Sequence, residues 1–180
     1  RTSRDGQMVI MHDAGVDRMT NGTGKIKDLT WDELKNLKVF DKSRPSKKTF
    51  RIPTFSEVLN TCKGKINIYL DFKDADVEET YRQIREAGME RQVVVYVNSI
   101  PQYKDWRKTA PAIPLIISVI DEVKTKDELS FFLGQGTIEV LDNVYEKAMI
   151  ETANEEGVAV WLDVQGDHEG PEIWNETLQK

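Results

Sequence analysis

Short apolar segments alternate with amphipathic segments along most of the chain. The apolar segments are rich in β-branched residues and largely continuous, which is typical of strands buried on both faces of a parallel sheet. Strands are predicted over residues 8–11, 66–72, 93–97, 115–119, 138–141 and 158–164. Helices are predicted between and after them, over residues 54–62, 77–87, 101–109, 126–133, 145–156 and 171–178.

Several predicted helices carry start and stop signals. Thr54 with Glu57 forms a capping box, in which each residue satisfies a backbone N–H of the other. Gly64, Gly88 and Gly157 follow helix ends, where a left-handed residue is favoured. Strands that alternate with helices of this length indicate βαβ units and an α/β fold with a parallel sheet. Right-handed crossovers leave two architectures, an open doubly wound sheet or a closed barrel.

One long segment, residues 13–53, interrupts this alternation. It is rich in Gly, Asp, Thr and Lys and contains one short predicted helix over residues 30–37, with Thr30 and Glu33 as a second capping box. A long insertion at the carboxyl end of a strand is where α/β enzymes build a lid or a substrate pocket. We find no internal repeat and no boundary of a second domain.

Composition and charge exclude several classes of function and several kinds of metal site. The chain has 180 residues and a formal net charge of -6, which argues against a general nucleic-acid binder. The single cysteine, Cys62, excludes a disulfide within the chain and a multi-cysteine zinc site. With only 2 His, a metal site would depend on carboxylates, which favour Mg²⁺, Ca²⁺ or Mn²⁺. No apolar run approaches the roughly 18 residues of a transmembrane helix.

Functional side chains in parallel α/β folds gather at the carboxyl ends of the strands. His12 is either a half-exposed histidine bonded to Asp13 or a general acid or base. Asp71 and Lys73 share a strand face and form either a buried ion pair or a metal ligand beside an anion-binding ammonium. Other polar or aromatic residues at predicted strand ends are Tyr96, Asn98, Ser118, Asp142, Asn143, Trp161 and Asp163.

Three segments carry a resemblance to a known family. Residues 9–13 (VIMHD), 17–24 (DRMTNGTG) and 28–34 (DLTWDEL) resemble the glycerophosphodiester phosphodiesterase family. Residues 51–59 (RIPTFSEVL), 68–73 (IYLDFK) and 160–161 (VW) are similar to later motifs of that family, in the same order. The resemblance covers essentially the whole chain.

The resemblance implies a TIM (βα)8-type barrel. Residues 1–180 would form one partial barrel domain with strands two, in part, through seven, and residues 13–53 would be a small insertion after the second strand. The first and last strands of the family barrel are absent from the sequence. The family's amino-terminal His-Arg pair and its Glu-x-Asp metal pair are also absent from these residues. The remaining metal ligands are therefore expected in a segment before Arg1.

The resemblance also implies metal-dependent hydrolysis of a glycerophosphodiester to an alcohol and sn-glycerol 3-phosphate. His12 would be a general acid or base and one half of a histidine pair. Asp71, where the family often has Glu, would bind a divalent metal, Mg²⁺ or Ca²⁺. Lys73 would neutralise the phosphate, and Trp161 would be an apolar wall for the glycerol or leaving group unless it is a structural core residue. No role follows for Asp163 or His168.

Two alternatives remain open: a non-catalytic barrel that binds phosphoryl ligands, and another phosphodiesterase or phospholipase on the same barrel. The expected partner is a small-molecule substrate, with no nucleic acid and no transmembrane segment. A periplasmic or secreted location is favoured over a cytoplasmic one. The head group and oligomeric state do not follow from the sequence. Since half of the expected site lies outside these residues, we expect the 180 residues alone to be inactive. A barrel without its first and last strands has two unpaired strand edges, so we also expect poor solubility.

Overall fold

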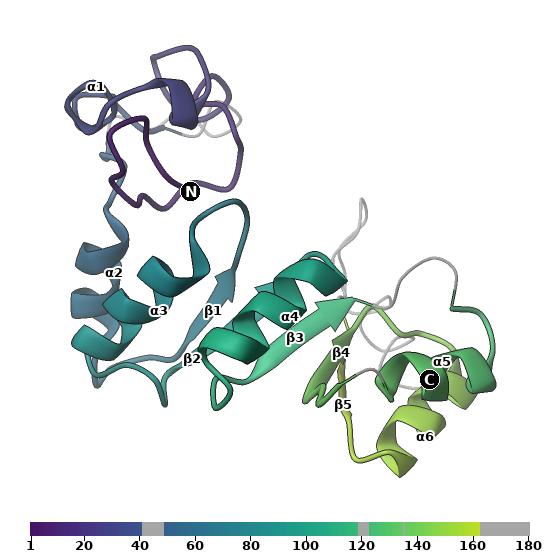
Figure 1. Ribbon diagram of the computed structural model, residues 1–180. Coiled ribbons are helices and arrows are strands. Elements are labelled where there is room, and N and C mark those ends of the chain that lie inside the picture. Colours follow the sequence, from purple (N-terminus) through teal and green to yellow (C-terminus); the bar gives the residue numbers. More distant parts are fainter. Residues whose placement is uncertain (41–48, 119–122, 135, 163–180) are drawn as a thin grey trace. The chain divides into compact units, whose positions relative to one another are not determined.

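A computed structural model describes residues 1–40, 49–118, 123–134 and 136–162 of the chain (Figure 1). The chain divides into two compact units, Arg1–Val93 and Val94–Lys180. The assignment of residues 1–180 to one domain stays a prediction. No helix in the described ranges is long and apolar enough to span a bilayer.

The first unit contains one strand and a series of short helices. Its elements are η1 (Ile26–Asp28), α1 (Trp31–Lys35), α2 (Phe55–Cys62), β1 (Ile68–Asp71) and α3 (Val77–Glu86). Both predicted capping boxes are confirmed. The side chains of Thr30 and Thr54 each accept from the backbone N–H three residues on, and the side chains of Glu33 and Glu57 accept from the backbone N–H of Thr30 and Thr54. These helices therefore start where the local sequence places them.

The described part of the segment 13–53 has a hydrophobic core of its own. Val9, Val16, Ile26, Leu34 and Ile52 are buried together, and partly buried apolar residues pack around them. Isolated antiparallel bridges hold the chain around this core, at Gly15↔Lys25, Thr20↔Val39 and Val39↔Phe50. The predicted insertion is thus an ordered substructure, because it buries enough apolar surface to offset part of its chain entropy.

The expected strand over residues 8–11 differs in the structure. Met8 and Val9 are buried as predicted, but each forms only an isolated antiparallel bridge, Met8 with Thr2 and Val9 with Thr54. The reason is a tight reversal before them, in which Gly6 has φ 87° and donates its N–H to the Ser3 carbonyl. The apolar pattern thus identified the burial of Met8 and Val9, but not their pairing partners or the exposure of Ile10, which is 38%.

The second unit is a parallel α/β layer. Strands β2 (Val93–Val97), β3 (Leu115–Ser118), β4 (Val140–Asp142) and β5 (Ala159–Trp161) pair in parallel in the order β2-β3-β4-β5. Each pair of consecutive strands is connected by a helix: α4 (Ile100–Thr109), α5 (Lys126–Leu133) and α6 (Lys147–Glu155), in that order. The predicted α/β fold with a parallel sheet is confirmed.

The predicted boundaries agree with the observed ones to within one to three residues for most elements. Three predicted helix ends are confirmed by backbone geometry, since Gly64 has φ 69°, Gly88 has φ 65° and Gly157 has φ 77°. The predicted helix 171–178 and residues 119, 163 and 164 of the predicted strands lie outside the described residues.

Candidate active site

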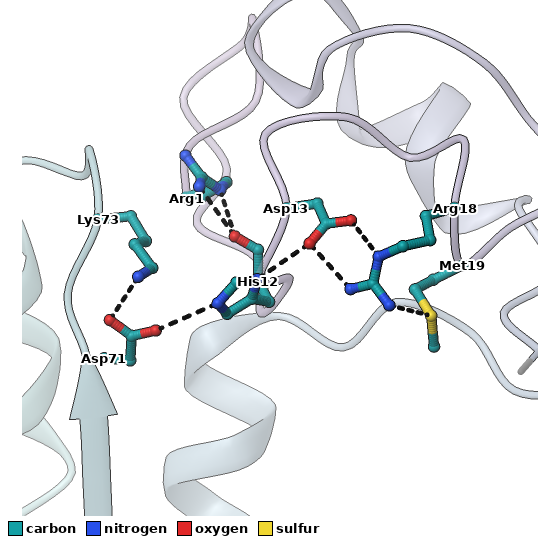
Figure 2. A network of polar contacts seen from close by, with 7 residues as sticks. All are labelled: Arg1, His12, Asp13, Arg18, Met19, Asp71 and Lys73. Atoms are coloured by element: carbon teal, nitrogen blue, oxygen red, sulfur yellow. Dashed lines mark hydrogen bonds and ion pairs between the residues drawn. The ribbon is translucent and has the colours of Figure 1, made fainter. Parts of the chain in front are cut away.

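The main chain at His12 is held by an arginine. Arg1 donates from Nε and Nη2 to the His12 carbonyl oxygen, at 3.0 and 2.8 Å (Figure 2). The same guanidinium donates from Nη1 to Asp74 Oδ2 at 2.6 Å, just after β1. Arg1 therefore joins the segment of His12 to the loop that follows β1, a contact for which the sequence offers no local signal.

The imidazole of His12 lies between two carboxylates. Its Nδ1 is 2.9 Å from Asp13 Oδ1, and its Nε2 is 3.8 Å from Asp71 Oδ2 (Figure 2). The side chain is 71% exposed, so the ring is open to a ligand. The structure thus brings His12 and Asp71, which are distant in sequence, to one place, although His12 does not end a strand of the sheet.

Asp13 is also bound by a second arginine. Arg18 donates from Nε to Asp13 Oδ2 at 2.6 Å and from Nη2 to Asp13 Oδ1 at 2.9 Å. The Arg18 hydrogen bonds, followed by the bond to His12, hold the pKa of the Asp13 carboxyl well below its usual range. Asp13 is therefore an ionised acceptor at neutral pH.

Asp71 and Lys73 lie on the same side of the chain, as their spacing predicts. Asp71 is the last residue of β1, and its Oδ1 is 2.8 Å from Lys73 Nζ. At this distance the Lys73 ammonium is the charged partner of Asp71 Oδ1. Both side chains are partly buried, which strengthens their electrostatic interaction over that of a surface pair.

A cavity of about 300 Å³ adjoins these groups. Its polar lining comes from Arg1, His12, Asp71 and Lys73, and its apolar walls come mainly from residues 8–11 and 68–70 with Phe55. A mostly apolar hollow with a few convergent polar groups is the usual form of a small-molecule site. The arrangement can transfer a proton at His12 and attract an anion at Lys73.

The described residues fit a divalent metal only in part. Asp71 is a carboxylate at the cavity, and carboxylate oxygens suit a hard cation such as Mg²⁺ or Ca²⁺, but its Oδ1 already faces the Lys73 ammonium at 2.8 Å. Within the described ranges, no group of three or more His, Cys, Asp or Glu side chains is arranged to hold a metal ion. This part of the chain therefore supplies one candidate ligand and not a complete metal centre.

The second unit has a polar cluster of its own at the carboxyl ends of its strands. Tyr96 Oη lies 2.7 Å from Ser118 Oγ, to which Asn143 Nδ2 also donates at 3.3 Å. Asn143 has φ 60°, a left-handed conformation that is uncommon outside glycine. Trp161 is 46% exposed at the end of β5, where it pairs in register with Asp142. Its role as a pocket wall stays a prediction.

Two polar residues considered in the sequence analysis lie outside the described part of the chain, and two arginines that contact the candidate active site were not predicted. Asp163 and His168 lie outside the described residues. Sequence reasoning assigned no part to Arg1 or Arg18, although each contacts His12 or its partner Asp13. For Arg18, the one available signal is the short spacing from Asp13, which allows a turn to bring the two charges together.

Comparison with known proteins relates the chain to one family. The model of the glycerophosphoryl diester phosphodiesterase family matches residues 1–162. The chain is 32% identical over 116 residues to a glycerophosphodiester phosphodiesterase from Caldanaerobacter subterraneus subsp. tengcongensis, covering 61% of this chain and 48% of that protein. It is also 32% identical over 100 residues to a glycerophosphodiester phosphodiesterase from Bacillus subtilis, covering 51% of this chain and 31% of that protein.

A solved structure extends the similarity to the fold. The crystal structure of a glycerophosphoryl diester phosphodiesterase from Parabacteroides distasonis superposes with a TM-score of 0.77 at 26% identity, covering 99% of this chain and 65% of that one. The predicted fold, a TIM (βα)8-type barrel that is incomplete in these residues, is confirmed by such similarity. The chain spans about half, or less, of the length of the curated relatives it matches.

Proposed function

Because this chain belongs to the glycerophosphoryl diester phosphodiesterase family, we propose that it forms part of an enzyme that hydrolyses a glycerophosphodiester to an alcohol and sn-glycerol 3-phosphate. One observation carries the proposal. His12, Asp71 and Lys73 converge on a single cavity of about 300 Å³. A proton-transfer group beside a cation is what hydrolysis of an anionic diester requires, since catalysis there consists largely of positioning and charge stabilisation.

His12 is the proton-transfer group of this proposal. Its ring is exposed toward the cavity and is held on one edge by Asp13. It acts either as general base toward the attacking water or as general acid toward the leaving alcohol. In either role the reactive atom is Nε2, because Nδ1 is engaged by Asp13 at 2.9 Å.

Lys73 is the anion-binding group. Its side chain is 22% exposed, and its ammonium lies 2.8 Å from Asp71 Oδ1. Partial burial lowers the effective dielectric around the ammonium, so its attraction for a diester phosphate exceeds that of a lysine in open solvent. Asp71 keeps this cation in place before the substrate enters.

Asp71 is proposed as one ligand of a divalent cation, Mg²⁺ or Ca²⁺. Such a cation, when bound, supplies Lewis-acid polarisation of the phosphoryl oxygens. Asp71 is the candidate because it is a carboxylate that lines the cavity beside His12. The specific metal and the remaining ligands are part of the proposal and not of the described site.

The test uses the full-length protein with glycerophosphocholine as substrate. His12→Ala should lower kcat by at least ~10²-fold, the usual scale for a positioned acid or base. Lys73→Ala should lower kcat/KM, whereas Lys65→Ala, an exposed lysine outside the cavity, should not. Chelation should abolish turnover, and Mg²⁺ or Ca²⁺ should restore it. Unchanged turnover in a folded His12→Ala protein would end the assignment, and glycerol 3-phosphate binding without any turnover would favour the non-catalytic alternative.

A further inference from the structure

We propose that Arg18 is a positioning residue for His12 and acts through Asp13. The guanidinium fixes the carboxylate, and the carboxylate fixes the imidazole as the tautomer with its proton on Nδ1, which leaves the Nε2 lone pair available in the neutral ring. This proposal rests on the proposed function only for its kinetic consequences, since the tautomer itself is a property of the folded protein.

The geometry of the Arg18–Asp13 pair is bidentate. Two parallel donors of the guanidinium, Nε and Nη2, reach the two oxygens of Asp13 at 2.6 and 2.9 Å (Figure 2). A fork of this kind fixes the plane of the carboxylate as well as its position, which a single contact does not. Asp13 Oδ1 is also the atom that faces His12 Nδ1, at 2.9 Å.

The tautomer follows from the donor and acceptor rules. An ionised carboxylate only accepts hydrogen bonds, so the nitrogen that faces it must carry a proton. In a neutral imidazole the other nitrogen is then the acceptor. Asp71 Oδ2 lies 3.8 Å from His12 Nε2, beyond hydrogen-bond distance, so Asp13 at 2.9 Å from Nδ1 is the carboxylate that selects the tautomer. With Asp13 held in place, His12 Nε2 is the acceptor, and a neutral His12 is prepared to act as a general base. Without a fixed Asp13, neither tautomer is selected by this contact.

The backbone explains why Arg18 can act as a fixed point. Val16 is fully buried in the core of the segment 13–53, and its N–H donates to the Gly24 carbonyl at 2.9 Å. The Thr20 N–H and hydroxyl both donate back to the Val16 carbonyl, at 3.0 and 2.7 Å. Arg18 lies between these two anchored residues. Asp13 therefore gains its orientation from a turn that is tied to a packed core.

Arg18 is better explained as a positioning group than as a phosphate clamp. Its Nε and Nη2 are occupied by Asp13, and its Nη1 contacts Met19 Sδ at 3.3 Å. It does not line the cavity that His12 and Lys73 share. An exposed ion pair with only a surface role would contribute little to stability and nothing to the chemistry. The experiment must separate these two roles.

The kinetic arm compares Arg18→Met with Arg82→Met in the full-length protein. Arg82 is the matched control, because it is also a half-exposed arginine with carboxylate partners, Glu79 and Glu86, but lies on α3 away from His12. Arg18→Met should lower kcat about 10- to 100-fold, the scale seen when an outer partner of a functional histidine is removed, with little change in KM. Arg82→Met should leave both constants unchanged, and Arg18→Lys should recover part of the loss.

The spectroscopic arm reads the ring directly. In protein labelled with ¹⁵N at histidine, the His12 resonances at a pH where the ring is neutral should show the Nδ1–H form in the wild type and in Arg82→Met. Arg18→Met and Asp13→Asn should show a mixture of tautomers. A merely structural ion pair would change neither the tautomer nor kcat beyond the change seen for Arg82→Met.

The outcomes distinguish failure of this inference from failure of the proposed function. A wild-type tautomer in a folded Arg18→Met protein, or a kcat within twofold of wild type, overturns the positioning role. A loss of kcat that is equally large in a His12→Ala background also overturns it, because the effect would not pass through His12. If the protein turns over no glycerophosphodiester at all, the proposed function fails while the tautomer measurement still decides this inference.

Discussion

Leu34 tests whether the segment 13–53 is held by a core of its own. Leu34 lies on α1 with no exposed surface and packs with Val9, Val16, Ile26 and Ile52. We expect Leu34→Ala to destabilise this substructure and to lower catalytic activity as well. The second effect follows because two members of the same cluster, Val9 and Val16, anchor the chain on either side of the proposed active-site loop.

The magnitude follows from the burial. At about 0.8 kcal/mol per buried methylene-sized group, cutting the isobutyl side chain to a methyl group costs about 2 kcal/mol in lost transfer free energy. The cavity left behind adds to this, and fully buried Leu→Ala changes span about 2–5 kcal/mol. The cluster draws its members from well-separated stretches of chain, which cannot easily collapse into the space. We therefore expect a loss of about 3 kcal/mol in the free energy of unfolding of this substructure.

The assay is hydrogen–deuterium exchange read by mass spectrometry on the full-length protein, together with denaturant unfolding. Exchange reports the opening free energy of the peptides around α1 and η1 separately from the rest of the molecule. Phe50→Ala is the matched control, because Phe50 belongs to the same segment but is 66% exposed. Its effect should stay within about 0.5 kcal/mol, as for other surface substitutions.

The contrast between the two variants decides the matter. If Leu34→Ala costs less than about 1 kcal/mol, or no more than Phe50→Ala, the cluster is not a packed core and the argument from its burial is wrong. If stability falls but kcat does not, the core does not hold the His12 loop. Either result would require another source of order for that loop.

Three further predictions concern stability. Arg51, followed by the backbone N–H of Thr54, lowers the pKa of Glu57 from 4.5 to about 2. The contribution of ionised Glu57 to the stability of the fold is therefore present above about pH 4.5 and is lost as pH falls toward 2. The Tm advantage of wild type over Glu57→Gln should shrink across that range, and a constant difference from pH 7 to pH 2.5 would contradict it. Glu139 accepts from Arg107 and from a backbone N–H of β3, at 2.6 and 3.1 Å, so Glu139→Ala should cost about 2 kcal/mol in denaturant unfolding; an unchanged midpoint would refute this. Gly157 has φ 77° and open space around it, so Gly157→Ala should cost about 1 kcal/mol through backbone strain alone, and Gly157→Asn should cost less. Equal stability of the wild type and both variants would show that the strain argument fails.

Local features of this protein were readable from the sequence because their causes are local. A capping box joins residues three apart, so Thr30–Glu33 and Thr54–Glu57 set the starts of α1 and α2 wherever those helices lie. The alternation of β-branched runs with amphipathic stretches identified the parallel α/β sheet in the same way. The strand-end rule nominated His12, Asp71 and Lys73, and Asp71 does end β1, whereas His12 follows a segment that forms only isolated bridges.

Pairings between distant residues were decided by the tertiary structure alone. Residues 8–11 have an apolar pattern that fits a sheet strand, yet Gly6 reverses the chain and pairs Met8 with Thr2 instead. Arg1 reaches Asp74, 73 residues away, and the His12 carbonyl, because packing places both beside it. No propensity encodes such contacts, since they depend on which buried surfaces meet. The sequence was enough to nominate His12, Asp71 and Lys73 as candidates, and packing decided which charges lie beside them.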